Sequence, residues 1–299
     1  MMVKLDPLIE GYLSYLADVG RKTRRTVIDV RCTLRRAVAA MAEIHPGVAL
    51  WHLELEHYLR WLERERQVGR TATSLAKYLS HVRGLLDYAW RSGRAERNVL
   101  DGFRLQDAVP SIAPRSLTLE EAQRLIQSCP RATAAERRDR LMVLLLYGCG
   151  LRTSELCDLD LADVNRERHE LQVLKAKGDR PRVIPIPEGV YTELLAHLLD
   201  RGGKRGALFR TEAKRRRVAP KDIGAVVCAA ARRAGLSGKV TARTLRHTFA
   251  THLMDRGVDL AVIASLMGHR SPAETGVYLH VLPHRRESAV SELVKEGRP

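Results

Sequence analysis

The sequence predicts a mainly α-helical protein of two domains, with a small antiparallel sheet in the second domain. Apolar residues recur at helical spacing along most of the chain. A proline-containing segment without periodicity interrupts this pattern at residues 104–116. Two short β-type segments flank a glycine at position 178. With 299 residues, of which 45% are hydrophobic, the chain is long enough for two ordinary domains.

The first domain is expected to span residues 1–103 as a bundle of helices. Its clearest apolar stripes are Val27, Val30, Leu34 and Val38, and then Leu75, Leu79, Val82, Leu86 and Trp90. Both stripes are typical of helix faces that form a core. Basic residues lie off the stripes, among them Arg21, Lys22, Arg24 and Arg25. Each alone is typical of a solvated surface charge, but together they match a helical module that binds phosphates.

The second domain is expected to span residues 117–299, after a linker at residues 104–116. Thr118 and Glu121 form a capping-box pattern, which predicts the start of a helix. The segment "ELQVLKAKGDRPRVIPIP" predicts two strands joined by a turn at Gly178-Asp179. Most of the remaining domain has helical periodicity.

A large excess of positive charge points to a polyanionic partner. Lys and Arg total 51 against 35 Asp and Glu, and the pI is about 10.1. Nucleic acid is the commonest such partner. An anionic membrane surface is disfavoured because the charge is spread over the whole chain. Residues 201–217 carry eight basic residues and one acidic residue, which is typical of either a solvated loop or a DNA-backbone contact.

The cysteines and the N-terminal segment weigh against several other classes. The five cysteines are odd in number and lack C-x-x-C spacing: Cys32, Cys129, Cys149, Cys157 and Cys228. We expect reduced, mostly buried thiols, with neither a zinc site nor a disulfide framework. The N-terminus has no secretion signal, and the longest apolar run, residues 141–147, is far below the ~20 residues of a membrane span. A cytoplasmic protein is expected.

Four places in the second domain hold residues typical of catalysis. Arg152 follows two glycines, where a helix is expected to begin. Lys177 lies on the turn of the predicted hairpin, and Arg246 lies on a later helix. His269 and Tyr278 follow near the C-terminus. Each residue alone is weak evidence, since an arginine at a helix start usually forms a salt bridge.

The surroundings of the tyrosine have a clear local pattern. Gly268 is expected to end one helix. Ser271 as N-cap, Pro272 at the first position and Glu274 in a capping box predict the next helix. Tyr278 then lies about two turns into that helix, where a lone tyrosine usually packs against a neighbour.

The helix that carries Arg246 also holds two histidines. Its expected inner stripe is Leu245, Phe249 and Leu253. We interpret His247 and His252 as structural side chains with satisfied hydrogen bonds.

In order, these motifs resemble those of the tyrosine recombinase family, the phage integrases and Xer-type recombinases. The similar segments are "LEEAQRLI", "YGCGLRTSELCDLDLADV", "KAKGDRPRVIPIP", "TLRHTFATHLMDRGVDLAVIASLMGH" and "TGVYLH". Residues 71–103 are similar to the last helices of the family's N-terminal module. The resemblance implies a core DNA-binding (SAM-like) helical bundle followed by a mostly helical catalytic domain with a small antiparallel sheet.

The resemblance also implies an activity, namely site-specific cleavage and rejoining of DNA through a Holliday junction. Arg152 and Arg246 would stabilise the charge on the scissile phosphate. Tyr278 would attack it to form a 3′-phosphotyrosyl link, which conserves bond energy without ATP. Lys177 would be the general acid and His269 would hydrogen-bond the phosphate.

Further implications concern the support of the site and its partners. Glu155 matches an acidic position that steadies the site, although it also fits an ordinary first-turn helix acid. The family requires no metal or nucleotide cofactor. The expected partners are double-stranded DNA recombination sites in a nucleoid-associated setting. The expected assembly is a tetramer on DNA, either of this chain alone or shared with a sister recombinase, and a short C-terminal tail after Arg286 would dock on a neighbouring subunit.

One position departs from the family pattern, because Arg243 stands where histidine is usual. Arg243 lies one helical turn before Arg246, which predicts a shared helix face. Arginine keeps a positive charge but cannot accept a proton near neutral pH. A non-catalytic or partner-dependent DNA-binding relative is therefore the first alternative function. A relaxing topoisomerase, with the same covalent chemistry, is the second.

Overall fold

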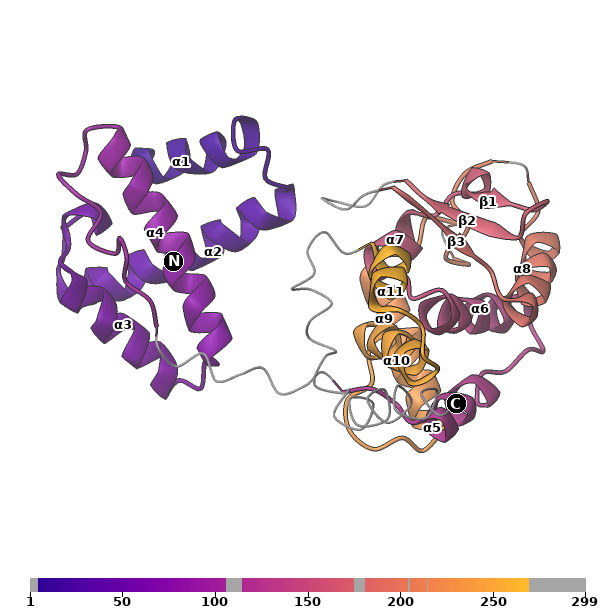
Figure 1. The fold of residues 1–299 in the computed structure, drawn as a ribbon. Coiled ribbons are helices and arrows are strands. Elements are labelled where there is room, and N and C mark those ends of the chain that lie inside the picture. Colours follow the sequence, from indigo (N-terminus) through magenta and orange to yellow (C-terminus); the bar gives the residue numbers. More distant parts are fainter. Residues whose placement is uncertain (1–4, 106–114, 175–180, 204, 214, 269–299) are drawn as a thin grey trace, which may run out of the picture. The chain divides into compact units, whose positions relative to one another are not determined.

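The computed structural model describes residues 5–105, 115–174, 181–203, 205–213 and 215–268. The chain divides into two compact units, residues 1–111 and 112–299, each with its own hydrophobic core. The predicted mainly helical class is confirmed (Figure 1). Some predicted features lie outside the described residues: Lys177, the Gly178-Asp179 turn, His269, Ser271, Pro272, Glu274, Tyr278 and the C-terminal tail.

The described part of the first unit is helical. It contains α1 (Pro7–Asp18), α2 (Arg24–Ile44), the short 3-10 helix η1 (Leu50–His52), α3 (Leu55–Gln67) and α4 (Ala72–Arg91). The helices begin at residues whose side chains can cap them. Asp6, Thr23 and Thr71 accept hydrogen bonds from backbone N–H groups in the first turns of α1, α2 and α4.

The predicted stripes of the first unit form its core, with one exception. Val30 and Leu34 are buried and Val27 and Val38 are partly buried, as expected. The expectation for Trp90 is wrong, since this side chain is 50% exposed while Ala89 is fully buried. The reason is the helical period of 3.6 residues, which brings position 89 closer than position 90 to the face begun by Leu75.

The second unit combines helices with one small sheet. Its helices are α5 (Leu119–Gln127), α6 (Ala134–Gly148), α7 (Thr153–Asp158), η2 (Leu161–Asp163), α8 (Glu188–Arg201), α9 (Pro220–Arg233), α10 (Ala242–Asp255) and α11 (Leu260–Met267). Figure 1 shows α6 at the centre, between α8 and the group formed by α9 and α10. The apolar run 141–147 lies in α6, and residues 141–146 are buried in the core. Among the described residues, no helix is long and apolar enough to cross a membrane.

The predicted hairpin is present, and a third strand joins it. β2 (Glu170–Val173) pairs antiparallel with β3 (Arg182–Pro185), so that Val173 lies opposite Arg182. The sequence did not predict β1 (Val164–Asn165), which pairs antiparallel with β2. With two residues, β1 is too short to show a period. The capping box of Thr118 and Glu121 is confirmed at the start of α5.

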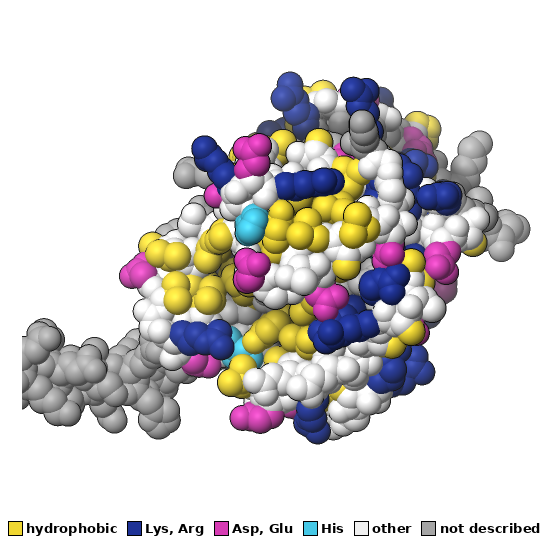
Figure 2. Space-filling model, turned by 90° about the vertical axis from the view of Figure 1, so that its right-hand side faces the viewer, with side chains coloured by type: hydrophobic (Ala, Val, Ile, Leu, Met, Phe, Trp, Pro, Cys, Tyr) yellow, Lys and Arg dark blue, Asp and Glu magenta, His cyan; other side chains and the backbone are white. Residues whose placement is uncertain are grey.

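Side chains of different kinds are mixed on the face shown in Figure 2, and all five thiols are free. Figure 2 shows one face on which apolar, basic and acidic side chains are interspersed, so no single charge covers that face. All cysteines are free, as expected. Three of them, Cys129, Cys149 and Cys157, are buried, and Cys32 and Cys228 are exposed.

Candidate active site

Arg152 is placed by a tight connection between two helices. α6 ends at Gly148, and α7 begins with Arg152 as its N-cap, where the sequence predicted a helix start. Between them Gly150 has a positive φ of 60°, and a Cβ there would lie 2.4 Å from the ring of Phe249. Glycine is therefore needed both for the backbone conformation and for the close approach of α10.

Glu155 is the centre of the site, because three arginines surround its carboxylate. Oε2 accepts the backbone N–H of Arg152 at 2.8 Å, and Oε1 accepts Nη1 of the same residue at 3.0 Å. Arg182 binds the carboxylate with two hydrogen bonds of 2.8 Å. Nη1 of Arg246 lies 3.8 Å from Oε2. We call Arg152, Glu155, Arg182 and Arg246 the arginine cluster.

The cluster keeps Glu155 ionised although the residue is only 4% exposed. Burial alone would raise the pKa of the carboxyl. Hydrogen bonding and charge attraction from Arg182, the Arg152 N–H and the charge of Arg246 outweigh burial and lower the pKa to about 2. One carboxylate thus faces three guanidinium groups, and the cluster retains a positive charge that an anion can neutralise.

The same three arginines also bind the end of α11. Arg182 donates Nε to the carbonyl of Leu266 at 2.7 Å. Arg246 donates Nη2 to Met267 at 2.7 Å, and Arg152 donates to Met267 at 3.3 Å and to Gly268 at 3.5 Å. Carbonyls in the last turn of a helix lack helical partners and carry its negative dipole end. They therefore attract and orient the three cations.

Gly268 ends α11 in the left-handed conformation, as the sequence predicted. A Cβ at this position would lie 2.7 Å from Nη1 of Arg182, so the close approach also requires glycine. His269 is the next residue along the chain and lies outside the described residues. Lys177 is likewise undescribed, in the connection between β2 and β3, and Tyr278 is undescribed beyond α11.

Arg246 and Arg243 differ in their surroundings although both lie on α10. Arg246 is 7% exposed, and besides the contacts above it donates Nη1 to the carbonyl of Gly150 at 2.8 Å. Arg243 is exposed in the first turn, and within the described part of the chain it has no hydrogen bond or ion pair. The structure therefore brings Arg152 and Arg246 together, whereas Arg243 lies outside the arginine cluster.

A structural histidine, His252, holds α10, the helix that carries Arg243 and Arg246, as predicted. His252 is buried, with Nδ1 2.9 Å from the hydroxyl of Tyr147 and Nε2 3.0 Å from the carbonyl of Leu117. Of the expected inner stripe of α10, Leu245 and Phe249 are buried and Leu253 is partly buried.

Arg182 is the residue that the sequence analysis missed. Its side chain is 6% exposed, and it connects the carboxylate of Glu155 to α11. The signal was present in the alternation of β3. Ile184 and Ile186 point into the core, and Arg182 has the same parity. A basic residue at a core-facing strand position needs a buried anionic partner.

The fold and the site together define a class of protein. The protein is mostly helical, it has two units, and its buried, pre-oriented arginines can stabilise negative charge on an oxyanion such as a phosphate. Among the described residues there is no group of His, Cys, Asp and Glu able to hold a metal ion.

Comparisons with known proteins agree with this class. Residues 115–285 match the phage integrase family, and residues 9–93 match the phage integrase N-terminal SAM-like domain. Tyrosine recombinase XerA of Pyrococcus furiosus is 36% identical over 78% of each chain. The XerA protein of Thermococcus kodakarensis is 35% identical over 96% of this chain and 95% of that one. The chain belongs to the phage integrase family and is a tyrosine-type site-specific recombinase.

Solved structures share the fold. The Tn1549 transposon integrase in complex with a circular intermediate DNA matches with a TM-score of 0.76 and 19% identity, covering 96% of this chain and 99% of that one. A lambda integrase dimer bound to a COC′ core site matches with a TM-score of 0.73 and 20% identity, covering 92% and 77% of the two chains.

Proposed function

We propose that this enzyme cuts and rejoins DNA at specific sites through a 3′-phosphotyrosyl intermediate on Tyr278, and that two rounds of exchange pass through a Holliday junction without ATP or metal. The observation that carries the proposal is the arginine cluster. It fixes Arg152 and Arg246 at the end of α11, immediately before His269 and ten residues before Tyr278.

The proposed role of the cluster is to stabilise charge in the transition state. Attack on a phosphodiester adds negative charge to its non-bridging oxygens. The side chain of Arg152 is 27% exposed and accessible to a ligand, whereas that of Arg246 is buried and held by two backbone carbonyls. Donors that are already oriented need no rearrangement as the charge develops, which makes them effective in catalysis.

The covalent step exchanges one phosphate ester bond for another. The hydroxyl oxygen of Tyr278 forms a bond to phosphorus and loses its proton to water, and the bond from phosphorus to the 5′ oxygen breaks. Lys177 gives a proton to that leaving oxygen, and His269 hydrogen-bonds the phosphate. Rejoining reverses the sequence, with a 5′-hydroxyl attacking and Tyr278 leaving. These three roles rest on the family motifs in the sequence.

Arg243 supplies a fixed cation in this proposal. It is exposed in the first turn of α10, so its guanidinium is accessible to DNA. It cannot exchange a proton near neutral pH, so proton transfer must rest on other groups. If the enzyme lacked cleavage activity, Arg243 would be the feature that explains a purely DNA-binding relative.

The two units have different roles in the proposed reaction. The first unit binds the core recombination site, and its residues Arg21, Lys22, Arg24 and Arg25 are all exposed and available to phosphates. The second unit carries out strand transfer. The active assembly is a tetramer on two DNA sites, formed by this chain alone or with a sister recombinase, and the tail after Arg286 links neighbouring subunits.

Covalent trapping tests the proposal. Duplexes bound by the full-length protein are selected from a random library, nicked near each candidate cleavage position, incubated with protein and run on a denaturing gel. We expect a shifted protein–DNA band with the wild type and none with Tyr278→Phe, which keeps the ring but lacks the nucleophile. Binding without any covalent band, even with Arg243→His and a sister recombinase, would establish the DNA-binding alternative.

A further inference from the structure

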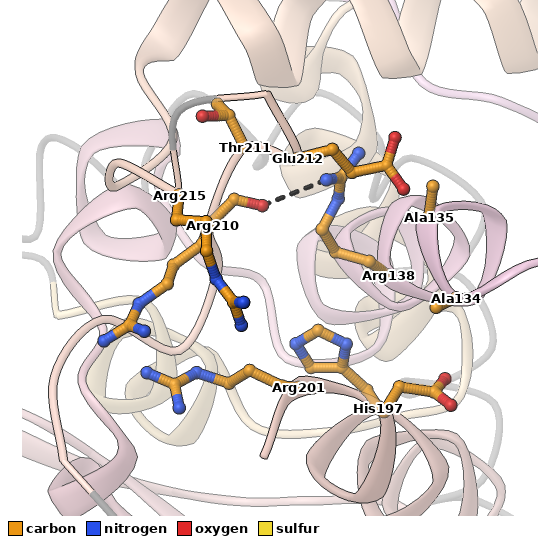
Figure 3. A pocket seen from close by; sticks show the side chains of 10 residues that line it. Ala134, Ala135, Arg138, His197, Arg201, Arg210, Thr211, Glu212 and Arg215 are labelled. Atoms are coloured by element: carbon orange, nitrogen blue, oxygen red, sulfur yellow. Dashed lines mark hydrogen bonds between the residues drawn. The ribbon is translucent and has the colours of Figure 1, made fainter. Parts of the chain in front are cut away.

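Recognition of a specific DNA sequence requires side chains that match the edges of the bases. Contacts to phosphates position a protein on DNA without distinguishing sequences. Arginine and lysine are donors, so they match the acceptors of guanine but not the amino group of adenine or cytosine. The hollow of about 240 Å³ at the end of α8 is lined by three such donors, Arg201, Arg210 and Arg215 (Figure 3). An amino group requires an acceptor, and the first unit presents one on its basic side.

The basic side of the first unit is formed by α2 and the start of α4. On α3 and just after it, arginines are paired with glutamates, which offsets their charge. The pairs are Arg60–Glu56, Arg64–Glu43, Arg66–Glu63 and Arg70–Glu65. In contrast, Arg21, Lys22 and Arg24 are exposed at the start of α2 and have no ion pair in the described part of the chain. The charge that attracts a polyanion thus lies at α2.

His81 lies on this basic side, where α4 packs against α2. Lys77, one turn before His81 on α4, donates Nζ to Oδ2 of Asp29 at 3.0 Å. Nδ1 of His81 lies 2.9 Å from the hydroxyl oxygen of Thr33, one turn after Asp29 on α2. Two successive turns of each helix therefore meet here. The ring of His81 is partly exposed at this junction, next to the exposed Lys77.

Thr33 determines which nitrogen of His81 carries the proton. Thr33 is 4% exposed, and its hydroxyl donates to the carbonyl of Asp29 at 3.1 Å. Since a hydroxyl has a single proton, the same oxygen accepts a hydrogen bond from Nδ1 of His81, and we assign the proton to Nδ1. Nε2 then has a lone pair. This nitrogen is not buried, and it has no hydrogen bond to any residue that the structure describes.

The surroundings of His81 also keep its ring neutral. Burial lowers the pKa of His81, the charge of Lys77 lowers it further, and the charge of Asp29 opposes the shift. The pKa is therefore below its ordinary value of 6.5, so the imidazole is uncharged near pH 7. Nε2 is thus an acceptor on a basic surface. A DNA phosphodiester has no proton to donate, so this nitrogen does not match the DNA backbone.

We propose that His81 is a specificity-determining residue, whose Nε2 accepts a hydrogen bond from the amino group of adenine or cytosine in the recombination site. This inference rests on the proposed function, in which the first unit binds the core site. An α-helix fits the major groove, where N6 of adenine and N4 of cytosine are donors, whereas guanine and thymine present acceptors but no donor. Because Thr33 already holds the ring, little side-chain entropy is lost on binding.

Selection of bound duplexes tests the assignment and requires no DNA cleavage. The full-length wild type and His81→Phe, which keeps a ring but lacks both nitrogens, select duplexes from the same random library. We expect the wild type to prefer adenine or cytosine at one position of the site by about fivefold or more, the effect of one hydrogen bond. His81→Phe should lose this preference and keep the others. His52→Phe is the matched control, because His52 is an exposed histidine of η1, and it should keep every preference.

Base analogues provide a second measurement, on the wild type itself, so it does not depend on the folding of a variant. The preferred base is replaced by an analogue without the amino group, which is purine for adenine and 2-pyrimidinone for cytosine. The affinity of the wild type should fall about fivefold or more at the position read by His81. The same analogue at other positions of the site controls for the weaker base pair. The two analogues also distinguish adenine from cytosine as the base that is read.

Several results would overturn the assignment of His81. One is a set of base preferences that is the same in His81→Phe and in the wild type. Another is a preference for guanine or thymine at the affected position, because Nε2 would then be a donor. An equal loss of affinity for all sequences would assign His81 to a phosphate contact or to a structural role. A wild type that binds DNA without any sequence preference would instead refute the site-specific function on which the inference rests.

Discussion

Glu155→Gln probes the arginine cluster directly, because the amide keeps the size of the side chain and removes its charge. The pKa of Glu155 is about 2 in the folded protein against an ordinary 4.5. Since a tenfold change in proton affinity equals about 1.4 kcal/mol, the ionised carboxylate contributes about 3 kcal/mol to stability at neutral pH. This magnitude agrees with the ~3–5 kcal/mol lost when a buried ion pair loses one partner.

The sign of the pH dependence follows from the lowered pKa. The contribution of Glu155 is fully present above pH 4.5, the unfolded value, and is lost as the pH falls through about 2, the folded value. The stability difference between wild type and Glu155→Gln is therefore expected to stay constant from pH 7 to pH 5 and to shrink at lower pH.

The distribution of tryptophan provides the assay. All three tryptophans, Trp51, Trp61 and Trp90, lie in the first unit. Fluorescence during urea unfolding thus reports the first unit, whereas far-UV circular dichroism reports the helices of both units. Glu155→Gln should lower the free energy of unfolding seen by circular dichroism and leave the fluorescence transition unchanged. Glu167→Gln, at an exposed position of the second unit, is the matched control.

Two results would refute the reasoning about Glu155. A loss below about 1 kcal/mol at pH 7 would place its contribution at the level of a surface ion pair. A difference that did not shrink below pH 4.5 would show that the effect does not arise from the carboxylate charge.

Three further predictions concern activity and assembly. Arg182→Lys keeps the charge but loses the bidentate geometry, so covalent trapping should slow by at least about tenfold while gel-shift affinity for DNA stays unchanged; an equal loss of DNA affinity would contradict a positioning role. Arg243→His should leave the trapping rate similar or raise it, and complete loss of the covalent band would contradict this interpretation of Arg243. Truncation after Arg286 should weaken assembly on DNA in sedimentation velocity runs while Tyr278→Phe, kept as the intact control, still assembles; unchanged assembly would remove the tail from the interface.

Local signals in the sequence were sufficient for many features of the fold. The capping box at Thr118 and the glycine end of α11 at Gly268 were predicted correctly, because both depend on contacts within a few residues. The helix start at Arg152 was predicted for the same reason, and the pairing of β2 with β3 was predicted because two β-type segments follow each other closely in the chain. The prediction for Trp90 was wrong because it followed the apolar character of this side chain. The helical period decides which face is buried, and it places Ala89 on the core face while Trp90 is exposed.

Residues of the site were predicted unequally. Arg152 and Arg246 were recognised from motifs, and the structure brings them together at α11. Arg182 was missed because its function depends on Glu155 and Leu266, both distant in sequence. The basic run 201–217 was expected to be solvated or to contact DNA. The structure shows that one of its members, Arg217, donates to the carbonyls of Cys157 and Leu159 at 2.9 and 3.1 Å, and DNA contact by the run stays a prediction.

The helical class, the small hairpin, the basic character and the family motifs could all be predicted from the sequence, because periodicity, capping and residue order are local properties of the chain. Which charges are paired became apparent only from the fold. Glu155 holds three arginines from three elements. The physical reason is that the free energy of a charged or polar side chain depends on burial and on neighbours brought together by folding, and a linear pattern does not contain either quantity.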